Sequence, residues 1–280
     1  MKRLFCLLML TVLALGTLAG CGGQTKPIAM GDDVQGNVAL NGSTSMEKAV
    51  GILSESFMAK HKLVKITYDA TGSGTGIEAV ANGRCDIGLA SRDLKNKEKQ
   101  LGLKSETLAR DGIAIIVHKD AKLDSLSVKQ VSDIFSGKIS SWQTVDGRNG
   151  RIACIGREAG SGTRDGFESI TKTGGKCKLA QELTSTGAVL EAVKNNPQAM
   201  GYVSYASVIG KKDIKVLKID GVECTAENIS GGKYVVQRPF NLILKDGAKL
   251  SPQAEAFLKY ALSKENGDLL KKAGVVPAVR

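Results

Sequence analysis

Residues 157–164 read Arg-Glu-Ala-Gly-Ser-Gly-Thr-Arg and join a strand-like run at 151–155 to a helix-like run at 165–171. Glycines let a backbone approach a ligand closely, and the free N–H groups of a helix start, two hydroxyls and a guanidinium are all hydrogen-bond donors. This combination predicts a site for a small oxyanion. The same residues also fit an ordinary helix start with Ser161 or Thr163 as its N-cap, so the prediction needs support from elsewhere in the chain.

The same strand–turn–helix pattern occurs twice earlier in the chain. A short strand at 38–40 is followed by Asn-Gly-Ser-Thr-Ser at 41–45 and then by apolar residues at helical spacing. A run rich in β-formers at 63–68 is followed by Thr-Gly-Ser-Gly-Thr-Gly at 71–76 and a short helix. Neither turn has the spacing of a dinucleotide-binding motif or a P-loop. We therefore expect an α/β fold with three donor-rich turns.

One acidic residue lies close to such a strand end. The strand-like run at 85–90 is followed by Ser91-Arg92-Asp93. An ionised Asp93 can only accept hydrogen bonds, so in an anion site it would favour an anion that carries a proton. Taken alone, an N-cap or a surface ion pair is the more ordinary role for this residue.

The rest of the chain continues the alternation of strands and helices. A nearly continuous apolar run at 112–118 is typical of a strand buried on both faces, and Ser127 is a predicted cap for a helix at 127–135. We expect Pro239 to break the chain before an apolar strand at 240–244. Further helices are expected at 186–195, 252–262 and 265–273, and further strands at 200–203, 216–217 and 234–236.

The first residues have the composition of an export signal. Lys2 and Arg3 precede an apolar run at 4–15, and Leu-Ala-Gly leads to Cys21. This pattern resembles the bacterial lipoprotein signal, which implies a signal peptide at 1–20, cleavage before Cys21 and lipid on that cysteine. Residues 21–35 then read as a lipidated tether. An ordinary signal peptide with an incidental cysteine is the alternative.

Composition narrows the classes of partner. The formal net charge is +11, which favours anionic partners in general, but the basic residues are interspersed with acids as on a solvated surface. Aromatic residues make up only 4% of the chain, which argues against nucleic-acid binding through stacked bases. The remainder after the signal is long for one core and sufficient for two domains.

Cysteines and histidines give little sign of a metal or cofactor. Four cysteines lie beyond Cys21, and their spacing allows three complete pairings without choosing among them. No C-x-x-C pair is present, and His61 and His118 are the only histidines, so no metal and no cofactor are expected. The four cysteines are Cys85, Cys154, Cys177 and Cys224.

Several of these stretches match one family in order and spacing. The chain resembles the phosphate-binding protein of the bacterial high-affinity phosphate ABC transporter over nearly all of its mature length. Each glycine- and serine-rich turn is weak evidence alone, but the combination is specific. The matching stretches are 42–45, 72–76, 86–88 with Ser91 and Asp93, 133–138 with Trp142, 157–163 and 201–203.

The resemblance implies an α/β, two-lobed periplasmic-binding-protein-like fold of type II, with two crossover strands and a ligand cleft between the lobes. The crossovers would lie near 112–118 and 236–242. Lobe I would comprise 36–114 plus 240–280, and lobe II 115–239. The implied protein is a lipid-anchored monomer on the extracytoplasmic face of the cell membrane. It would not be an enzyme, and it would deliver inorganic phosphate to the permease and ATPase subunits of an importer.

The resemblance also implies the residues that bind phosphate. Ser91 and Arg92 compete with Asp93 for the place in the cleft, because the spacing from Asp86 is longer here than in some relatives. In this interpretation Asp93 accepts the proton of hydrogen phosphate and repels sulfate. The implied contacts are Thr44, Ser45, Ser73, Ser91, Asp93, Arg157, Ser161, Gly162 and Thr163.

Three other functions remain open at this point. The site would also suit another tetrahedral oxyanion such as sulfate. An enzyme acting on phosphate esters is less supported, because Ser161 would need a base and neither histidine lies in a matching motif. An adhesion or signalling protein that uses the two-lobed fold without transport is the third possibility.

Overall fold

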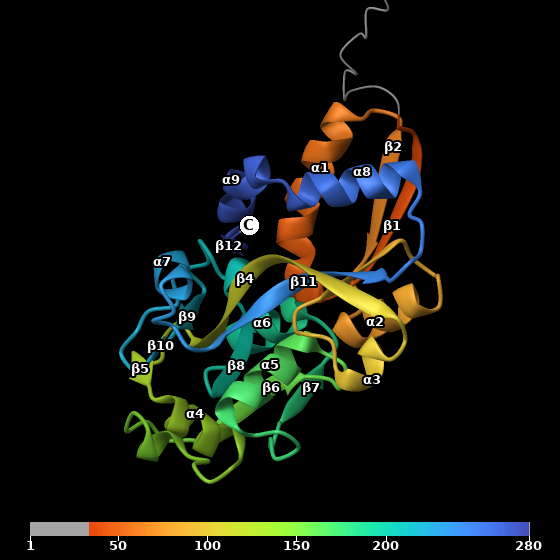
Figure 1. The fold of residues 1–280 in the computed structure, drawn as a ribbon. Helices are drawn as coiled ribbons and strands as arrows, with labels where there is room; N and C mark the ends of the chain where they lie inside the picture. The colour runs from red at the N-terminus through yellow and green to blue at the C-terminus, as the bar shows by residue number, and fades with distance from the viewer. Residues whose placement is uncertain (1–33, 280) are drawn as a thin grey trace, which may run out of the picture.

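The computed structural model describes residues 34–279 of this chain, and it has two lobes joined by long strands (Figure 1). Strand β4 (Leu103–His118) and strand β11 (Gln237–Lys245) run antiparallel and pass between the lobes. The predicted α/β two-lobed fold is confirmed. The pairing of β4 changes from β11 to β8 (Ala199–Ser204) between Gly112 and Ile113.

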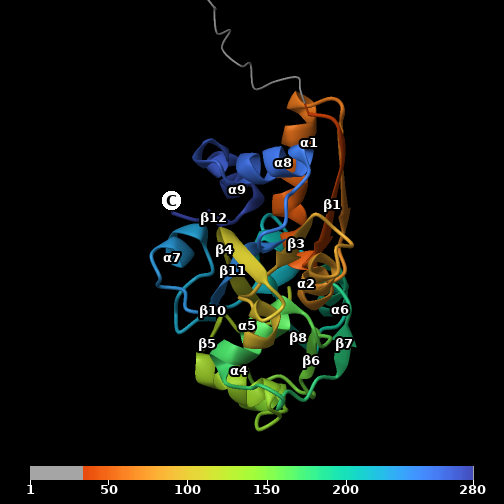
Figure 2. The ribbon, with the colours of Figure 1, turned by 45° about the vertical axis from the view of Figure 1, so that its right-hand side comes forward.

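The first lobe is built on a mixed sheet in the order β2-β1-β3-β11-β4. Its parallel strands are β1 (Gly36–Gly42), β2 (Val64–Asp69) and β3 (Ile87–Ala90). Helices α8 (Pro252–Leu262) and α9 (Gly267–Ala273) pack beside α1 (Glu47–Lys60), as Figure 2 shows. Helix α2 (Ser73–Ala81) follows β2.

The second lobe continues the sheet on the other side of β4, in the order β4-β8-β6-β7. Strands β6 (Ala153–Arg157), β7 (Gln181–Leu183) and β8 are parallel to one another. Helix α5 (Gly162–Thr171) follows β6, and helix α6 (Thr186–Lys194) follows β7. The sequence therefore repeats one unit, strand then helix, in both lobes.

Short elements complete the described chain. The helices are η1 (Thr44–Met46), α3 (Asn96–Lys99), α4 (Val128–Phe135), η2 (Trp142–Thr144), η3 (Tyr205–Ser207), α7 (Ala226–Ser230) and η4 (Lys264–Asn266). The strands are β5 (Ser125–Leu126), β9 (Ile214–Val216), β10 (Lys218–Ile219) and β12 (Val276–Pro277).

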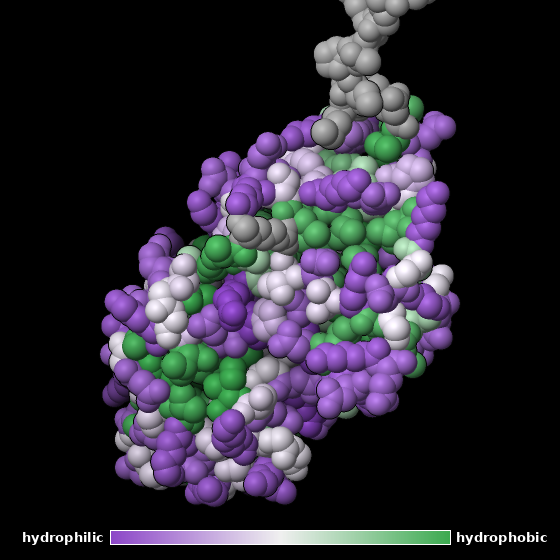
Figure 3. Space-filling model, in the orientation of Figure 1, coloured by the Kyte–Doolittle hydropathy of each residue, from purple (hydrophilic) through white to green (hydrophobic). Residues whose placement is uncertain are grey.

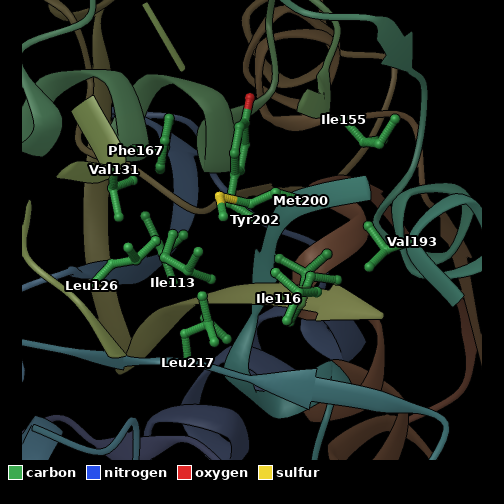
Figure 4. Packing of buried hydrophobic residues seen from close by; sticks show 14 of the residues in the cluster. Ile113, Ile116, Leu126, Val131, Ile155, Phe167, Val193, Met200, Tyr202 and Leu217 are labelled. Carbon is green, nitrogen blue, oxygen red and sulfur yellow. The ribbon is translucent and has the colours of Figure 1, made fainter. Parts of the chain in front are cut away.

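Each lobe has its own apolar core. The largest group of buried apolar side chains runs from Ile113 to Val236, and Figure 4 shows part of it. In this group the ring of Phe167 on α5 stacks on Tyr202 of β8 with 4.1 Å between centroids, which fixes α5 against the sheet. A second group joins residues 38–109 to 240–275 and also includes Ala206. The lobe boundaries at 114/115 and 239/240 stay a prediction.

Two sequence expectations differ from the structure at the second crossover. Residues 234–236 were expected as a strand, but β11 begins only at Gln237. Pro239 was expected to break the chain, but it lies inside β11 opposite Arg110. Proline has no N–H to give to a ladder, so it is tolerated where a strand has one free edge. β11 pairs with β3 only over 241–243, which leaves that edge free at Pro239.

Trp142, the cysteines and the surface of the described residues bear on packing and chemistry. Trp142 is fully buried, and its indole N–H donates to the Gln198 carbonyl at 3.0 Å. The four cysteines beyond Cys21 all carry free thiols. Cys21 and the predicted signal peptide lie outside the described residues. Within residues 34–279, no helix is long and apolar enough to cross a membrane. Hydrophilic residues cover most of the face in Figure 3.

The contact between α2 and the end of β1 gives a test of the fold. A Cβ on Gly76 would lie 2.4 Å from the Asn41 carbonyl oxygen and 2.5 Å from the Gly42 Cα. Because backbone atoms cannot move aside, we expect Gly76→Ala to destabilise the protein by about 1–3 kcal/mol. Urea unfolding followed by circular dichroism measures this change.

Gly51→Ala is the matched control, because Gly51 also lies inside a helix but has open space around its Cα. This substitution is expected to stabilise the protein by roughly 0.5–1 kcal/mol. Equal effects of the two substitutions would contradict the close packing of α2 on β1.

Candidate functional site

Four helix starts meet where the two lobes face each other. Each follows the carboxyl end of a parallel strand: η1 and α1 follow β1, α2 follows β2, α5 follows β6 and α6 follows β7. In open α/β sheets this edge is where ligands bind. Each helix start carries roughly half a positive unit charge from its peptide dipoles. The fold therefore brings partial positive charge from both lobes to one place.

Buried hydroxyls occupy the space between these helix starts. We call them the hydroxyl cluster, and none of its side chains is more than 5% exposed. Four members precede or begin helices of the first lobe, one follows β3, and two begin helices of the second lobe. The members are Ser43, Thr44, Ser45, Ser73, Ser91, Thr163 and Thr186.

Hydroxyls of the two lobes bond directly to one another. The Oγ atom of Ser45 lies 2.8 Å from Oγ1 of Thr163 and 3.1 Å from Oγ1 of Thr186. Oγ1 of Thr44 lies 3.1 Å from the same Thr186 oxygen. A hydroxyl rotates to donate or accept as its neighbours require. The structure is therefore closed, with polar contacts from both lobes in one buried group.

A second part of the hydroxyl cluster depends on a close backbone approach. Ser91 N–H donates to Ser73 Oγ at 3.0 Å, and Ser43 Oγ donates to Ser91 Oγ at 2.9 Å. A Cβ on Gly162 would lie only 2.4 Å from Ser73 Oγ and 2.6 Å from Ser91 Oγ. Only glycine lets the start of α5 approach these hydroxyls so closely.

Arg157 contributes a full positive charge at the edge of the cluster. Its Nη1 donates to Thr44 Oγ1 at 3.0 Å, and its Nε and Nη2 donate to the carbonyls of Leu183 and Thr184. Among the described residues its hydrogen bonds go to carbonyl and hydroxyl oxygens rather than to a carboxylate. Burial lowers the pKa of Arg157 to about 10, so the group stays charged at neutral pH.

Ser161 has the capping role that the sequence left open. Its Oγ accepts from the Arg164 N–H at 3.3 Å, which makes it the N-cap of α5. The cap keeps α5 pointing its first turn, with Gly162 and Thr163, at the cluster. Ser161 itself is buried there, at 1% exposure.

The structure does not bring Asp93 into the hydroxyl cluster. Its side chain is exposed, and its Oδ1 accepts from the Asn241 amide at 3.3 Å. Arg92 also points elsewhere: its guanidinium pairs with both carboxylate oxygens of Glu98 at 2.7 and 2.8 Å. Of the three residues that follow β3, only Ser91 belongs to the cluster.

Arg92 also takes part in an ion pair between the lobes. Asp165 on α5 lies 2.8 Å from Arg92 Nε and 2.8 Å from Lys95 Nζ. We call these three residues the Asp165 latch. Glu98 also binds the Arg92 guanidinium. Burial alone would raise the pKa of Glu98. The hydrogen bonds from Arg92 and from the Lys95 N–H outweigh burial and lower that pKa overall.

Sequence reasoning missed four residues in or around the cluster. Ser43 lies in the turn at 41–45 whose next two residues were predicted as contacts. Thr186 starts a helix directly after a strand, within Ser-Thr-Gly at 185–187, so the pattern used for the other turns was available to find it. Asp111 and Arg238 lie on the two crossover strands and form a buried ion pair at 3.0 Å. Their only sequence signal is a charge inside or beside an apolar strand.

This arrangement suits binding of a tetrahedral oxyanion. Neutral donors, helix starts and one guanidinium converge from both lobes, and every hydroxyl can turn its hydrogen toward an anion. In the part of the chain that the structure describes, no group of three or more His, Cys, Asp or Glu side chains could hold a metal ion.

Comparisons with known proteins agree on one superfamily. The model of the PBP superfamily domain matches residues 28–265. The phosphate-binding protein PstS of Staphylococcus epidermidis is 31% identical over 95% of this chain and 86% of its own length. PstS of Bacillus subtilis is 27% identical over 99% of this chain and 94% of its own length.

Solved structures give the same result. A putative phosphate ABC transporter substrate-binding protein from Clostridium perfringens, solved with bound phosphate, superposes with a TM-score of 0.83 at 35% identity. It covers 87% of this chain and 100% of its own. An ABC-type phosphate transport receptor from Vibrio cholerae gives 0.71 at 29% identity, covering 86% of this chain and 100% of its own.

Removal of the Asp165 latch should favour the open protein. Asp165→Asn deletes the charge that pairs with Arg92 and Lys95, and a pair of this kind contributes roughly 1 kcal/mol. That corresponds to about a fivefold change in the ratio of open to closed molecules. Small-angle X-ray scattering without ligand should report a larger radius of gyration.

Glu168→Gln is the control on the same helix. Glu168 pairs with Arg164 at 2.8 Å, and both residues belong to α5. This substitution should leave the radius of gyration unchanged. An unchanged radius for Asp165→Asn as well would show that the latch does not hold the lobes together.

Proposed function

This chain belongs to the PBP superfamily and, within it, to the family of phosphate-binding proteins that includes PstS, and on that premise we propose that it is the substrate receptor of a phosphate ABC transporter. The receptor would bind inorganic phosphate outside the cytoplasm and deliver it to the importer. Proteins of this family are transport receptors, so no catalytic step is part of the proposal.

One observation carries the proposal: four helix starts, Arg157 and seven buried hydroxyls converge from two lobes. A buried group of donors needs an acceptor with several oxygens, and phosphate presents four. Charge-assisted hydrogen bonds from Arg157 add to the neutral donors. Because the donors come from both lobes, binding would stabilise the closed form over the open one.

The proposed phosphate contacts follow the hydroxyl cluster. Thr186 is added because its hydroxyl bonds to Thr44 and Ser45. Ser161 would act as the N-cap that orients α5. Asp93 is left out of the direct contacts, because its carboxylate is exposed and bonds to Asn241. The proposed contacts are Thr44, Ser45, Ser73, Ser91, Arg157, Gly162, Thr163 and Thr186.

The setting of the protein is also a proposal. The sequence Leu-Ala-Gly-Cys at 18–21 supports cleavage before Cys21 and a lipid anchor on the extracytoplasmic face of the cell membrane. Its partners would be the permease and ATPase subunits of the transporter. The receptor would be a monomer and would bind these subunits in its closed form. The expected lobes, 36–114 plus 240–280 and 115–239, would move as units about β4 and β11.

Sulfate is the second candidate ligand, because no carboxylate bonds to the hydroxyl cluster in the described structure. Every member of the hydroxyl cluster can donate to an anion, and in the described structure none of them hydrogen-bonds to a carboxylate. The proton of hydrogen phosphate would then be accepted by a hydroxyl oxygen. Such a site rejects an unprotonated anion less strongly than a carboxylate does.

Calorimetric titration of the soluble form, from residue 22, tests the proposal. We expect phosphate to bind more tightly than sulfate. Arg157→Met should weaken phosphate binding by at least about 30-fold, because loss of a buried charged donor costs roughly 2–5 kcal/mol. Arg151→Met, an exposed residue just before the same strand, is the matched control and should have no effect.

Two results would defeat the proposal. Wild-type protein that does not bind phosphate would rule out a phosphate receptor. Sulfate binding as tight as phosphate binding would favour the sulfate alternative. The melting temperature without ligand shows whether Arg157→Met still folds.

A further inference from the structure

A buried ion pair lies where the crossover strands pass the hydroxyl cluster. Asp111 on β4 is fully buried and Arg238 on β11 is 3% exposed. Arg238 Nη2 donates to Asp111 Oδ2 at 3.0 Å. The other carboxylate oxygen of Asp111 accepts from Ser204 Oγ at 2.9 Å and from the Ala206 N–H at 3.3 Å. Both carboxylate oxygens of Asp111 therefore have partners, and none of these partners belongs to the hydroxyl cluster.

Arg238 reaches from this pair into the cluster. Its Nη1 donates to Thr163 Oγ1 at 2.8 Å, and that hydroxyl bonds to Ser45 across the lobes. The same Nη1 lies 3.4 Å from the Ser91 carbonyl oxygen. Arg238 Nε is buried and has no hydrogen-bond partner among residues 34–279. One guanidinium thus has an unused donor beside the place where the lobes meet.

Two guanidinium groups consequently act on the same site. Burial lowers the pKa of Arg157, and the positive charge of Arg238 pushes it in the same direction, which places the two groups within electrostatic reach. Arg157 bonds to Thr44 and Arg238 to Thr163, so each contacts a different end of one chain of hydroxyls. Among residues 34–279, Arg238 forms a salt bridge with a carboxylate, Asp111, whereas Arg157 forms none and feels the charge of Glu158 without a salt bridge.

We propose that Arg238 is a second anion-binding guanidinium and that Asp111 is the counter-ion that limits the charge of the site, so that this pair determines which charge state of a tetrahedral anion binds. The inference rests on the proposed function of an anion receptor. Burial raises the pKa of Asp111, and the charge of Arg238 together with the hydrogen bonds from Ser204 and Ala206 opposes that rise. With Asp111 ionised, the two guanidinium groups and the carboxylate sum to one positive charge beside the helix starts. A site with one positive charge can bind either a monoanion or a dianion. A site with two positive charges favours the dianion.

Glu158 also acts on Arg157 through its charge, and none of the substitutions below alters it. Asp111 faces Ser204 of β8, the Ala206 N–H of η3 and, more distantly, the thiol of Cys224 and the phenol of Tyr234. Burial raises the pKa of both Cys224 and Tyr234, so both stay neutral. Arg238 faces the Asp111 carboxylate, the Thr163 hydroxyl, the Ser91 carbonyl and the ring of Phe240.

The test compares sulfate with phosphate at two pH values. Phosphate exchanges its second proton around neutral pH, whereas sulfate is a dianion throughout. Asp111→Asn keeps an acceptor for Arg238 but removes the negative charge. At about pH 6 it should raise the ratio of sulfate affinity to phosphate affinity by at least about fivefold. At about pH 8, where phosphate is mostly a dianion, the rise should be much smaller.

Asp93→Asn is the matched control, because it removes the same formal charge from an exposed side chain. Solvent screens that charge, so the affinity ratio should stay within about twofold of wild type. The double variant Arg238→Gln, Asp111→Asn restores the net charge. It should return the ratio to the wild-type value but weaken phosphate binding by about tenfold or more, because one donor is lost.

A purely structural role would lower both affinities by the same factor at both pH values, and that result for Asp111→Asn would overturn the proposal. The proposal would also be overturned if the double variant bound phosphate as tightly as wild type. This second measurement tests the proposal even if Asp111→Asn alone fails to fold. Wild-type protein that binds neither anion would instead count against the proposed function.

Discussion

Donor groups that converge inside a protein require acceptors, and this requirement governs the region between the two lobes. Four helix starts and Arg157 direct positive charge at hydroxyls that water hardly reaches. Leaving buried polar groups unpaired costs roughly 1–3 kcal/mol each. In the closed structure the hydroxyls of one lobe pair with those of the other. In the proposed function, an anion with several oxygens takes over the same pairing, which would couple closure to binding.

The architecture places these buried donors at the boundary between the two lobes. The sheets of both lobes end their parallel strands at the shared edge, and β4 and β11 are the strands that pass between them. Thr44, Ser45 and Ser73 come from one lobe, whereas Thr163 and Thr186 come from the other. No lobe has the complete set, so opening divides the site. The Asp165 latch and the Arg238 contact to Thr163 add charged links across the same boundary.

Much of this could be predicted from the sequence, because the informative patterns are local. A strand followed by glycine and hydroxyl residues and then a helix identified the starts of α1, α2 and α5, and with them Arg157 and Gly162. The same pattern at 185–187 would have found Thr186. The resemblance supplied the two-lobed fold, which no periodicity in the sequence gives.

The rest depends on contacts between residues far apart in the chain. Asp111 and Arg238 meet only because β4 and β11 pair, and a lone charge in an apolar strand does not reveal its partner. Asp93 and Ser91 are two residues apart, yet only Ser91 turns into the cluster while Asn241 of β11 holds Asp93 outside it. Pro239 stays within its strand because β11 has one free edge there. These outcomes follow from tertiary pairing rather than from local preference.

The most direct measurement is a crystal structure of the protein grown with inorganic phosphate. The account predicts one phosphate held between the lobes, with oxygens within hydrogen-bond distance of Arg157 and of hydroxyls from both lobes, including Ser45 and Thr163. A phosphate that contacts residues of one lobe alone, or that binds away from the hydroxyl cluster, would contradict it.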